Sequence, residues 1–526
     1  MKRIDVGNPS FEKLISNKNI YVDKTKYLYN LIQSGTTYFF CSRPRRFGKT
    51  LTLSTLESIF KGRKDLFENL YISKTDYNWK TYPIVHIDFS LCQAKTGLEA
   101  ESWINYAILK IAEEYDVILN REDNYYQNTA TLLAQLAKTE NVVILVDEYD
   151  KVLSSNIFSS HAEEIRDVLR GFFETIKGCY SYIHFCLITG VTKYSKLSVF
   201  SSMNNLVDIS MNDEYDALFG YTENELENYF HSYITSGAQA LNMSKELYLE
   251  RLKRKYDGYK FTLNGKSVYN PVSIGSFFYN GGKTFSNYWI ETGNTKLLLD
   301  LSRKVNFNVD TTLSEPLDIA ELSSFDILHL ASHTVRIGEV KALLLQSGYL
   351  TIKKVTDGGY SLLLDYPNEE VCESFNSRLL NIYTGIDSDI IYSPNRMLYA
   401  FNTSETENAI NYISSIYASI PYNLTGKNEA NYHAMFHCMM KAIGAKIISE
   451  KATNIGRIDS VLETEKQIYL IEFKINKSAN LAIKQIKNNE YYSEYLAENK
   501  TIHLLGISFS TTKKNIENWK EEIIEK

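Results

Sequence analysis

The first 211 residues alternate short apolar runs with longer stretches of helical pattern. The apolar runs are rich in β-branched and aromatic residues and have the length of buried strands, at 38–41, 83–89, 142–146 and 183–190. The helical stretches between them cover 99–115, 126–139 and 161–177. Because strands that alternate with helices pair in parallel, this part of the chain is predicted to be an α/β domain with a parallel sheet.

The middle of the chain changes to a charged, mostly helical pattern. Thr222 has the sequence setting of a helix N-cap, and we expect residues 212–310 to form a helical lid. A helix, two strands joined by an AspGlyGly turn and a further helix follow at 339–346, 349–355, 360–364 and from 368 onward. This is the outline of a winged-helix module, which would either contact DNA or bridge its neighbours, and the apolar face of its first helix favours bridging.

The C-terminal part returns to a mixed α/β pattern. Its predicted order is helix 429–443, strands 445–449, 457–462 and 467–474, helix 479–498 and strand 503–509. A short turn at 464–466 joins the second and third strands, which are therefore predicted to form a two-stranded ribbon. We divide the chain into four predicted domains, at 1–211, 212–310, 311–425 and 426–526.

Composition limits the kinds of protein that this sequence encodes. A chain of 526 residues exceeds what one hydrophobic core supports, so several domains are expected. The net charge of -6 argues against a protein that coats nucleic acid through its overall charge, and leaves only a local basic groove. Six cysteines without CxxC spacing favour a reduced, cytoplasmic protein. Apolar runs such as 142–146 are far shorter than a membrane span, so neither a secretory leader nor a membrane helix is expected.

A phosphate-binding loop is indicated between the first predicted strand and the next helix. Gly48, Lys49 and Thr50 stand where that helix begins. Backbone N–H groups and the helix dipole stabilise anions there, while the lysine ammonium suits phosphate and the threonine hydroxyl suits Mg²⁺. Arg43 stands where the common pattern G-x-x-x-x-G-K-[ST] has glycine. Because an ordinary strand–turn–helix can contain the same short motif, a second element is needed.

The second element is the acidic end of a later predicted strand. Apolar residues 142–146 run into Asp147 and Glu148. In P-loop enzymes the first acid holds Mg²⁺ and the second polarises the attacking water, so we assign these roles to Asp147 and Glu148. The alternative is an acidic strand end that caps the next helix. Thr189, at the end of the following strand, is either a residue that senses the γ-phosphate or a polar loop residue.

A second group of chemically suited residues lies on the C-terminal ribbon. Asp459 is on one strand, and Glu472 and Lys474 are on the next. The intervening turn is predicted to make the two carboxylates neighbours on one face, and the two-residue period of a strand puts Lys474 beside Glu472. Two carboxylates suit Mg²⁺, and a lysine can orient or deprotonate a water that attacks a phosphodiester. A solvated ion-pair network is the alternative, but it leaves the apolar opposite face of the strand unexplained.

Several longer motifs resemble those of one family. They are TyrValAspLysThr (21–25), SerArgProArgArgPheGlyLysThr (42–50), ThrGlyValThrLys (189–193), TyrAspGlyTyrLysPhe (256–261), TyrAsnPro (269–271), IleGlyArgIleAsp (455–459) and IleGluPheLys (471–474). The sequence is similar to the AAA-ATPase-like family, which is usually fused to a C-terminal PD-(D/E)XK domain. The resemblance implies that Arg45, Arg46 and Phe47 belong to the family's own phosphate loop. It also implies Glu429 as a further metal ligand and Gln485 as a further catalytic residue.

These features predict a P-loop NTPase sheet of AAA-like type with a helical lid, a winged-helix-like middle module and a restriction-endonuclease-like C-terminal domain. The predicted function is an ATPase coupled to a Mg²⁺-dependent nuclease, with ATP and Mg²⁺ as cofactors. Nucleic acid is the expected partner, DNA being favoured over RNA, no membrane is expected, and self-association is left open. Two alternatives are a nucleotide-dependent regulatory protein whose nuclease-like domain only binds nucleic acid or a partner, and a machine that remodels a protein or DNA complex.

Overall fold

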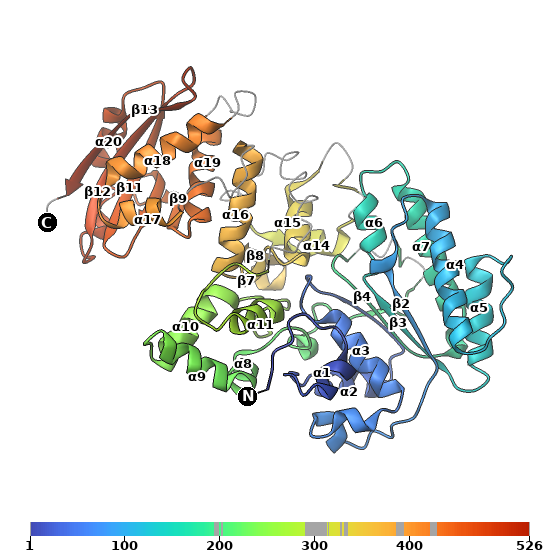
Figure 1. Cartoon of the computed structure of the whole chain (residues 1–526). Coiled ribbons are helices and arrows are strands. Elements are labelled where there is room, and N and C mark those ends of the chain that lie inside the picture. The colour runs from blue at the N-terminus through green and yellow to red at the C-terminus, as the bar shows by residue number, and fades with distance from the viewer. Residues whose placement is uncertain are drawn as a thin grey trace. The chain divides into compact units, whose positions relative to one another are not determined.

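The computed structural model divides the chain into two compact units (Figure 1). The first unit comprises 1–293 and 316–368, and the second comprises 294–315 and 369–526. The structure describes residues 2–193, 199–200, 203–289, 313, 315–326, 329–330, 335–384, 394–420 and 429–524. No helix in these ranges is both long enough and apolar enough to cross a lipid bilayer. The two units are a coarser division than the four predicted domains, whose boundaries stay predictions.

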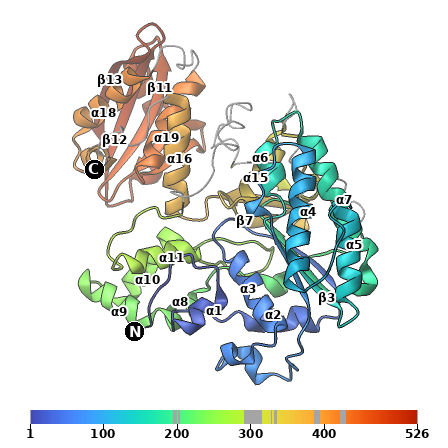
Figure 2. The same cartoon turned by 45° about the vertical axis from the view of Figure 1, so that its right-hand side comes forward.

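The first unit is built on the predicted parallel sheet. Its five strands are ordered β2 (Ile84–Asp88), β3 (Val142–Asp147), β4 (Ile183–Gly190), β1 (Tyr38–Ser42) and β5 (Val207–Asp208), and neighbouring strands pair in parallel. The accompanying helices are α3 (Lys49–Phe60), α4 (Gly97–Glu114), α5 (Tyr125–Leu136), α6 (Lys151–Asn156) and α7 (Ala162–Gly178), of which α4, α5 and α7 pack together (Figure 2). Because β4 lies between β1 and β3, the carboxyl ends of these three strands meet at one edge.

A helical layer follows the sheet in the chain and joins the N-terminal segment. It consists of α8 (Glu223–Tyr229), α9 (His231–Ala240), α10 (Lys245–Tyr256) and α11 (Pro271–Tyr279), and the N-terminal segment carries α1 (Phe11–Ser16) and α2 (Thr25–Gln33). Thr222 caps α8 as predicted, in a capping box with Glu225. Lys24 donates to both carboxylate oxygens of Glu225, at 2.8 and 2.7 Å, and thereby ties the N-terminal segment to the helical layer. The part of the predicted lid from 290 to 310 lies outside the described residues.

The predicted helix and hairpin of the middle module are present in the first unit. They are α15 (Ile337–Gln346), β7 (Thr351–Thr356) and β8 (Ser361–Asp365), to which the chain adds α14 (Ile319–Ser324) and the short strand β6 (Leu317–Asp318). The three strands form an antiparallel sheet in the order β6-β8-β7. Helix α15 is buried from Gly338 to Leu345, because its apolar residues are not confined to one stripe.

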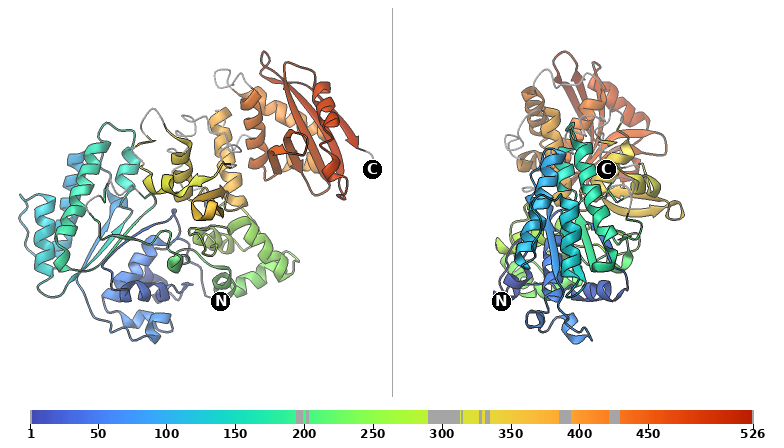
Figure 3. Two further views of the ribbon diagram at one scale, coloured as in Figure 1. Left: turned by 180° about the vertical axis from the view of Figure 1, so that it is seen from behind. Right: turned by 90° about the vertical axis from the view of Figure 1, so that its right-hand side faces the viewer.

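The second unit holds the predicted α/β core. Helices α16 (Glu369–Thr384), α17 (Pro394–Asn402), α18 (Thr406–Ser419), α19 (Glu429–Ala442) and α20 (Ala479–Asn488) accompany a sheet ordered β13-β12-β11-β10-β9, and α16 packs against α19 (Figure 3). Its strands are β9 (Lys446–Ala452), β10 (Arg457–Glu463), β11 (Gln467–Ile475), β12 (Thr501–Ser510) and β13 (Asn515–Ile524). The β11 and β12 strands pair in parallel, and the other neighbours are antiparallel.

Two features of this core differ from the sequence-based prediction. Helix α20 ends at Asn488, ten residues before the predicted end, because Tyr491 and Tyr495 turn inward and join the apolar core. The edge strand β13 was not predicted, since its pattern of charged and apolar residues resembles that of a surface segment.

A glycine beside the C-terminal ribbon tests the packing of α20. Gly506 pairs with Glu472 across β12 and β11, and a Cβ there would lie 2.5 Å from Ala479 O and 2.9 Å from the Ala482 Cβ. We expect Gly506→Ala to destabilise the second unit by about 1–3 kcal/mol, because α20 would have to move away from the sheet. Chemical unfolding of the full chain, followed by near-UV circular dichroism, measures this.

Gly178→Ala is the control for this prediction. Gly178 ends α7, and nothing lies within 4 Å of a Cβ placed there. We expect this variant to unfold like the wild type. Equal stability of both variants would contradict the close packing of α20 on β12.

Candidate functional sites

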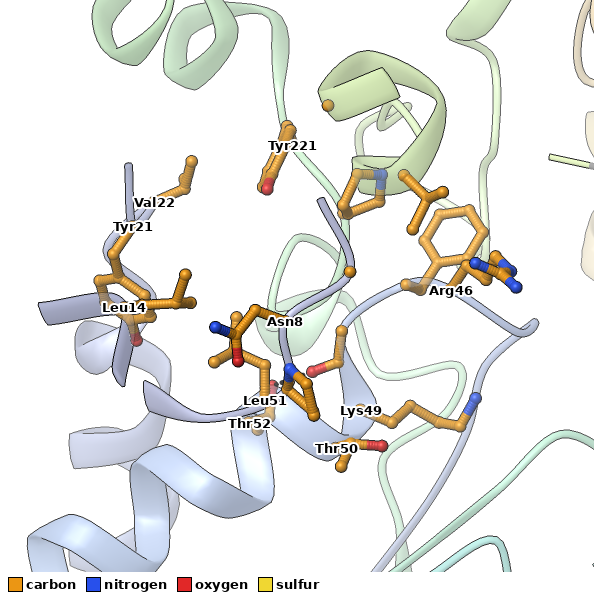
Figure 4. Close-up of a pocket in the computed structure, with 18 of the residues that line it drawn as sticks. Asn8, Leu14, Tyr21, Val22, Arg46, Lys49, Thr50, Leu51, Thr52 and Tyr221 are labelled. Carbon is orange, nitrogen blue, oxygen red and sulfur yellow. Dashed lines mark hydrogen bonds between the residues drawn. The ribbon is translucent and has the colours of Figure 1, made fainter. Parts of the chain in front are cut away.

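A cavity of about 360 Å³ adjoins the predicted phosphate loop. Its lining comes from segments that are far apart in the sequence: residues 45–52 of the loop and α3, residues 4–9 near the N-terminus, and the helical layer at Tyr221 and Phe230. Figure 4 shows Arg46, Lys49 and Thr50 on one side of this cavity and Tyr221 on the other. The cavity therefore has a cationic side with a helix N-terminus, which suits the phosphates of a nucleotide, and an apolar side, which suits its base.

The carboxylate of Asp147 is held by two hydroxyl groups. Thr50 Oγ1 donates to Asp147 Oδ2 at 2.6 Å, and Thr189 Oγ1 donates to Asp147 Oδ1 at 2.6 Å. The strand order produces this arrangement, because Thr189 is the next-to-last residue of β4, which lies between the strand before the phosphate loop and the strand that ends at Asp147. Thr50 and Asp147 thus lie together, as a Mg²⁺ site at the loop requires. Thr189 is fully buried, and its predicted contact with phosphate stays a prediction.

Lys49 and Glu148 complete the polar side of the cavity. Lys49 Nζ donates to the backbone carbonyls of Arg43 and Pro44, at 3.0 and 3.1 Å. Burial lowers the pKa of Lys49, and the neighbouring carboxylates of Asp147 and Glu148 oppose that effect. Burial also raises the pKa of Glu148, which lines the cavity with a backbone φ of 47°. A non-glycine residue in the left-handed region at a strand end is typical of a functional site.

The loop backbone turns at Arg46 and Gly48, which have φ values of 70° and 90°. Arg45, Arg46, Phe47 and Gly48 all line the cavity, so the structure brings the predicted loop residues together. The Phe47 ring is buried, with an edge-on contact to Tyr259 at 4.8 Å between ring centroids. Its contribution to a nucleotide site is therefore to position the loop.

Arg43, which stands at the glycine position of the common phosphate-loop motif, does not line the cavity. Its side chain is buried, and Nη1 donates to the carbonyls of Ser42 and Ser210, at 2.9 and 2.6 Å. The guanidinium carbon lies 4.6 Å from the centre of the Phe261 ring, a cation–π contact. Arg43 is therefore part of the scaffold that holds the loop, in the place where other phosphate loops have a glycine.

Sequence reasoning missed two contributions to this site. Residues 4–9 line the cavity, yet their sequence has no pattern that indicates it. Asp150 accepts hydrogen bonds from the N–H and Oγ1 of Thr192, at 2.8 and 2.6 Å, and so fixes the loop after β4. The signal that could have revealed this role of Asp150 is the further acid that follows Asp147 and Glu148 in the sequence Asp-Glu-Tyr-Asp (147–150).

The acidic residues of the C-terminal ribbon are neighbours, as predicted. Ser460 pairs with Ile471, so the next pair along the two strands is Asp459 and Glu472. The Asp459 N–H donates to Glu472 Oε2 at 3.4 Å, and the Phe473 N–H donates to Asp459 Oδ2 at 2.7 Å. The two carboxylates therefore lie side by side, although their assignment as metal ligands stays a prediction.

Lys474 lies beside this pair. Its Nζ donates to Glu472 Oε1 at 3.3 Å, and the Glu472 side chain is only 2% exposed. Burial, and next the charge of Asp459, raise the pKa of Glu472 to about 7, while Lys474 opposes the rise. A single ammonium thus faces two adjacent acids, and below about pH 7 a proton on the Glu472 carboxyl reduces the remaining negative charge.

The remaining predicted residues of this site are less well placed. The side chain of Glu429 lies outside the described part of the molecule, and its role stays a prediction. Helix α19, which begins at this residue, packs its His433 and Phe436 rings on Phe473, the face of β11 opposite Glu472. Gln485 is half-buried on α20, one turn after Ala482. Among the described side chains, no three His, Cys, Asp or Glu residues form a group that could hold a metal ion.

Comparisons with known proteins agree with this architecture. Residues 5–200 match the family model of a predicted AAA-ATPase, and residues 427–519 match that of the PD-(D/E)XK nuclease superfamily. The uncharacterized protein in the vnfD 5' region of Azotobacter chroococcum mcd 1 is 32% identical over 529 residues, which cover 98% of each chain. The chain therefore belongs to the family of AAA-ATPase-like proteins that carry a C-terminal PD-(D/E)XK nuclease superfamily domain.

Proposed function

We propose that this protein is a Mg²⁺-dependent nuclease whose phosphodiester cleavage is controlled by ATP bound at the N-terminal cavity. The observation that carries the proposal is the pairing of Asp459 with Glu472 beside Lys474 on the ribbon. The family models support the two activities separately, at residues 5–200 and 427–519. DNA is the first substrate to test, with RNA as the comparison.

The C-terminal residues suit a hard divalent cation. Asp459 and Glu472 offer carboxylate oxygens, which Mg²⁺ prefers, and the buried position of Glu472 makes a compensating charge favourable. These two residues, together with Glu429, would hold the ion. When bound, Mg²⁺ would supply Lewis-acid stabilisation of the charge that develops on the phosphate.

The ribbon's own residues would then act on the attacking water. Lys474 lies where its ammonium can orient that water once its bond to Glu472 is released, and after the ammonium has lost a proton to solvent its amine can accept the proton of the water. Gln485, on the helix that covers Gly506, would hold the water or the phosphate through its amide. No covalent intermediate with the protein is needed for such a hydrolysis.

The N-terminal cavity would bind ATP in a defined direction. Lys49 and Arg46 would pair with the phosphates, Thr50 and Asp147 would hold Mg²⁺, and Glu148 would polarise the water for hydrolysis. The apolar side near Tyr221 would receive the base. Thr189 would act through Asp147, because its hydroxyl is already bonded to that carboxylate.

Loss of the ribbon carboxylate of Glu472 or of the ammonium of Lys474 should strongly slow cleavage. We expect Glu472→Gln and Lys474→Ala to lower the Mg²⁺-dependent cleavage rate at least about 100-fold, because each removes a group that acts on the ion or the water. Cleavage of labelled DNA and RNA by the full-length protein measures this.

Glu463→Gln is the matched control for the carboxylate variants. Glu463 lies at the other end of β10, where it pairs with Lys446 at 2.5 Å. The control should cleave at the wild-type rate. If Glu472→Gln retained full activity, the ribbon would be a binding surface and the protein would belong to the regulatory class.

Mg²⁺ binding should depend on pH. The pKa of Glu472 is raised to about 7 from a usual value of 4.5, so its carboxyl group holds a proton below neutral pH and must release it to bind the ion. We expect the Mg²⁺ affinity to fall as the pH is lowered from about 8 to about 6 and to level off above that range.

Isothermal titration calorimetry with Mg²⁺, in buffers of different ionisation enthalpy and without nucleic acid, measures both the affinity and the proton release. Glu472→Gln should remove the proton release, and Glu463→Gln should preserve it. Proton release that is unchanged in Glu472→Gln would assign the titration to another group.

The nucleotide site should separate binding from hydrolysis. We expect Lys49→Ala to abolish ATP binding, whereas Glu148→Gln should bind ATP normally and hydrolyse it at least about 100-fold more slowly. Fluorescent-nucleotide titration and phosphate release measure the two steps. Glu140→Gln is the control, because Glu140 pairs with Lys80 on the surface. Normal hydrolysis by Glu148→Gln would contradict its assigned role.

A further inference from the structure

Residues 256–261, which we call the coupling segment, contact two residues of the phosphate loop, Phe47 and Arg43. The Phe47 ring meets the Tyr259 and Phe261 rings edge-on, at centroid distances of 4.8 and 5.2 Å. The Arg43 guanidinium lies over the Phe261 ring. A shift of the loop would therefore change the packing of the coupling segment directly, since closely packed rings in contact cannot move independently.

The same segment also contacts the middle module. The Lys260 N–H donates to Thr351 Oγ1 at 2.7 Å, and that hydroxyl donates back to the Lys260 carbonyl at 3.2 Å. Thr351 is the first residue of β7 and is 1% exposed. One threonine hydroxyl thus joins the coupling segment to the first strand of the hairpin.

A third contact reaches the end of the first unit. Gly258 has a φ of 97°, and any side chain there would overlap the Pro367 carbonyl oxygen. Asn368 Nδ2 donates to the Asp257 carbonyl at 2.7 Å, and Asn368 is the last residue of the first unit. Glycine at position 258 is what allows this approach.

The front of the phosphate loop contacts the turn between α15 and β7 as well. Gly348 lies so close to Pro44 that a Cβ there would be 2.7 Å from its ring. Trp289 Nε1 donates to the Arg45 carbonyl at 3.3 Å, and the Trp289 ring contacts Tyr349 at a centroid distance of 5.1 Å. Pro44 and Arg45, at the front of the loop, therefore rest on elements that lead to β7.

We infer that the coupling segment transmits the nucleotide state of the phosphate loop to β7 and to Pro367–Asn368, where the chain passes into the nuclease unit. The inference rests on the proposed function and assigns the regulation of its two sites to named contacts. A chain of close-packed contacts transmits small shifts because its members have few alternative arrangements. This coupling is measured as the effect of one ligand on the other site.

The first measurement uses hydrogen exchange in the wild-type protein, with and without Mg²⁺ and ATP. ATP binding is expected to slow the exchange of backbone amides in 256–261, 351–356 and at Asn368. A protein that binds ATP without any change in these amides would overturn the inference and leave the nucleotide site intact. A protein that does not bind ATP would instead overturn the proposed function on which the inference rests.

The second measurement uses variants that break single links. Thr351→Val removes both hydroxyl bonds to Lys260, and Asn368→Ala removes the bond to the Asp257 carbonyl. We expect each variant to bind ATP within about twofold of the wild-type affinity. The change in cleavage rate that ATP causes should be at least about fivefold smaller in each variant than in the wild type. Cleavage without ATP should stay at the wild-type rate, which separates lost coupling from lost folding.

Thr356→Val is the matched control, because Thr356 lies at the other end of β7 and its hydroxyl donates to Ser361 O. It should keep the full effect of ATP on cleavage. If Thr351→Val and Asn368→Ala also kept the full effect of ATP on cleavage, the inference would be overturned. An equal loss in Thr356→Val would overturn it as well, since the whole hairpin rather than the coupling segment would then be responsible.

Discussion

Both candidate sites depend on a carboxylate that is buried at or near the end of a central strand. Asp147 is 1% exposed and Glu472 is 2% exposed, and an ionised carboxylate removed from water costs several kcal/mol, on the order of the stability of a domain, unless neighbours compensate it. The two sites meet this constraint differently. Asp147 accepts two short hydroxyl bonds, whereas Glu472 has one lysine and an adjacent acid, and burial together with that acid raises the pKa of Glu472 to about 7.

The unusual front of the phosphate loop follows from its surroundings. An arginine replaces the usual glycine at position 43, and its charge is accommodated because Ser210 offers a carbonyl and Phe219 and Phe261 offer ring faces. These partners come from the chain after the sheet. The motifs at 42–50 and 256–261 therefore pack on each other, and the buried Arg43 depends on Phe261 of the second motif for one of its contacts.

Sequence patterns predicted the parts of this structure that local chemistry determines. The strand before Gly48, the acidic end at Asp147 and the pairing of Asp459 with Glu472 follow from hydrophobic runs and from counting across a short turn. Residues 4–9 and the contacts of 256–261 could not be predicted, because they bring together segments separated by tens to hundreds of residues. Likewise, the end of α20 at Asn488 is set by tyrosines that enter the core, a tertiary effect that outweighs helix propensity.

Lys474 reconciles two demands on the C-terminal site. Without a divalent cation, its ammonium is the positive charge bonded to Glu472, and the raised pKa of that acid supplies the remaining neutralisation as a bound proton. If Asp459 and Glu472 held a divalent cation, that proton would be released, and the bond from Lys474 would no longer be needed to compensate the charge of Glu472. The ammonium would then be free to face a water molecule instead of a carboxylate. Under the proposed function, the residue that compensates Glu472 in the free site would thus be the one that becomes available for chemistry when the site is filled.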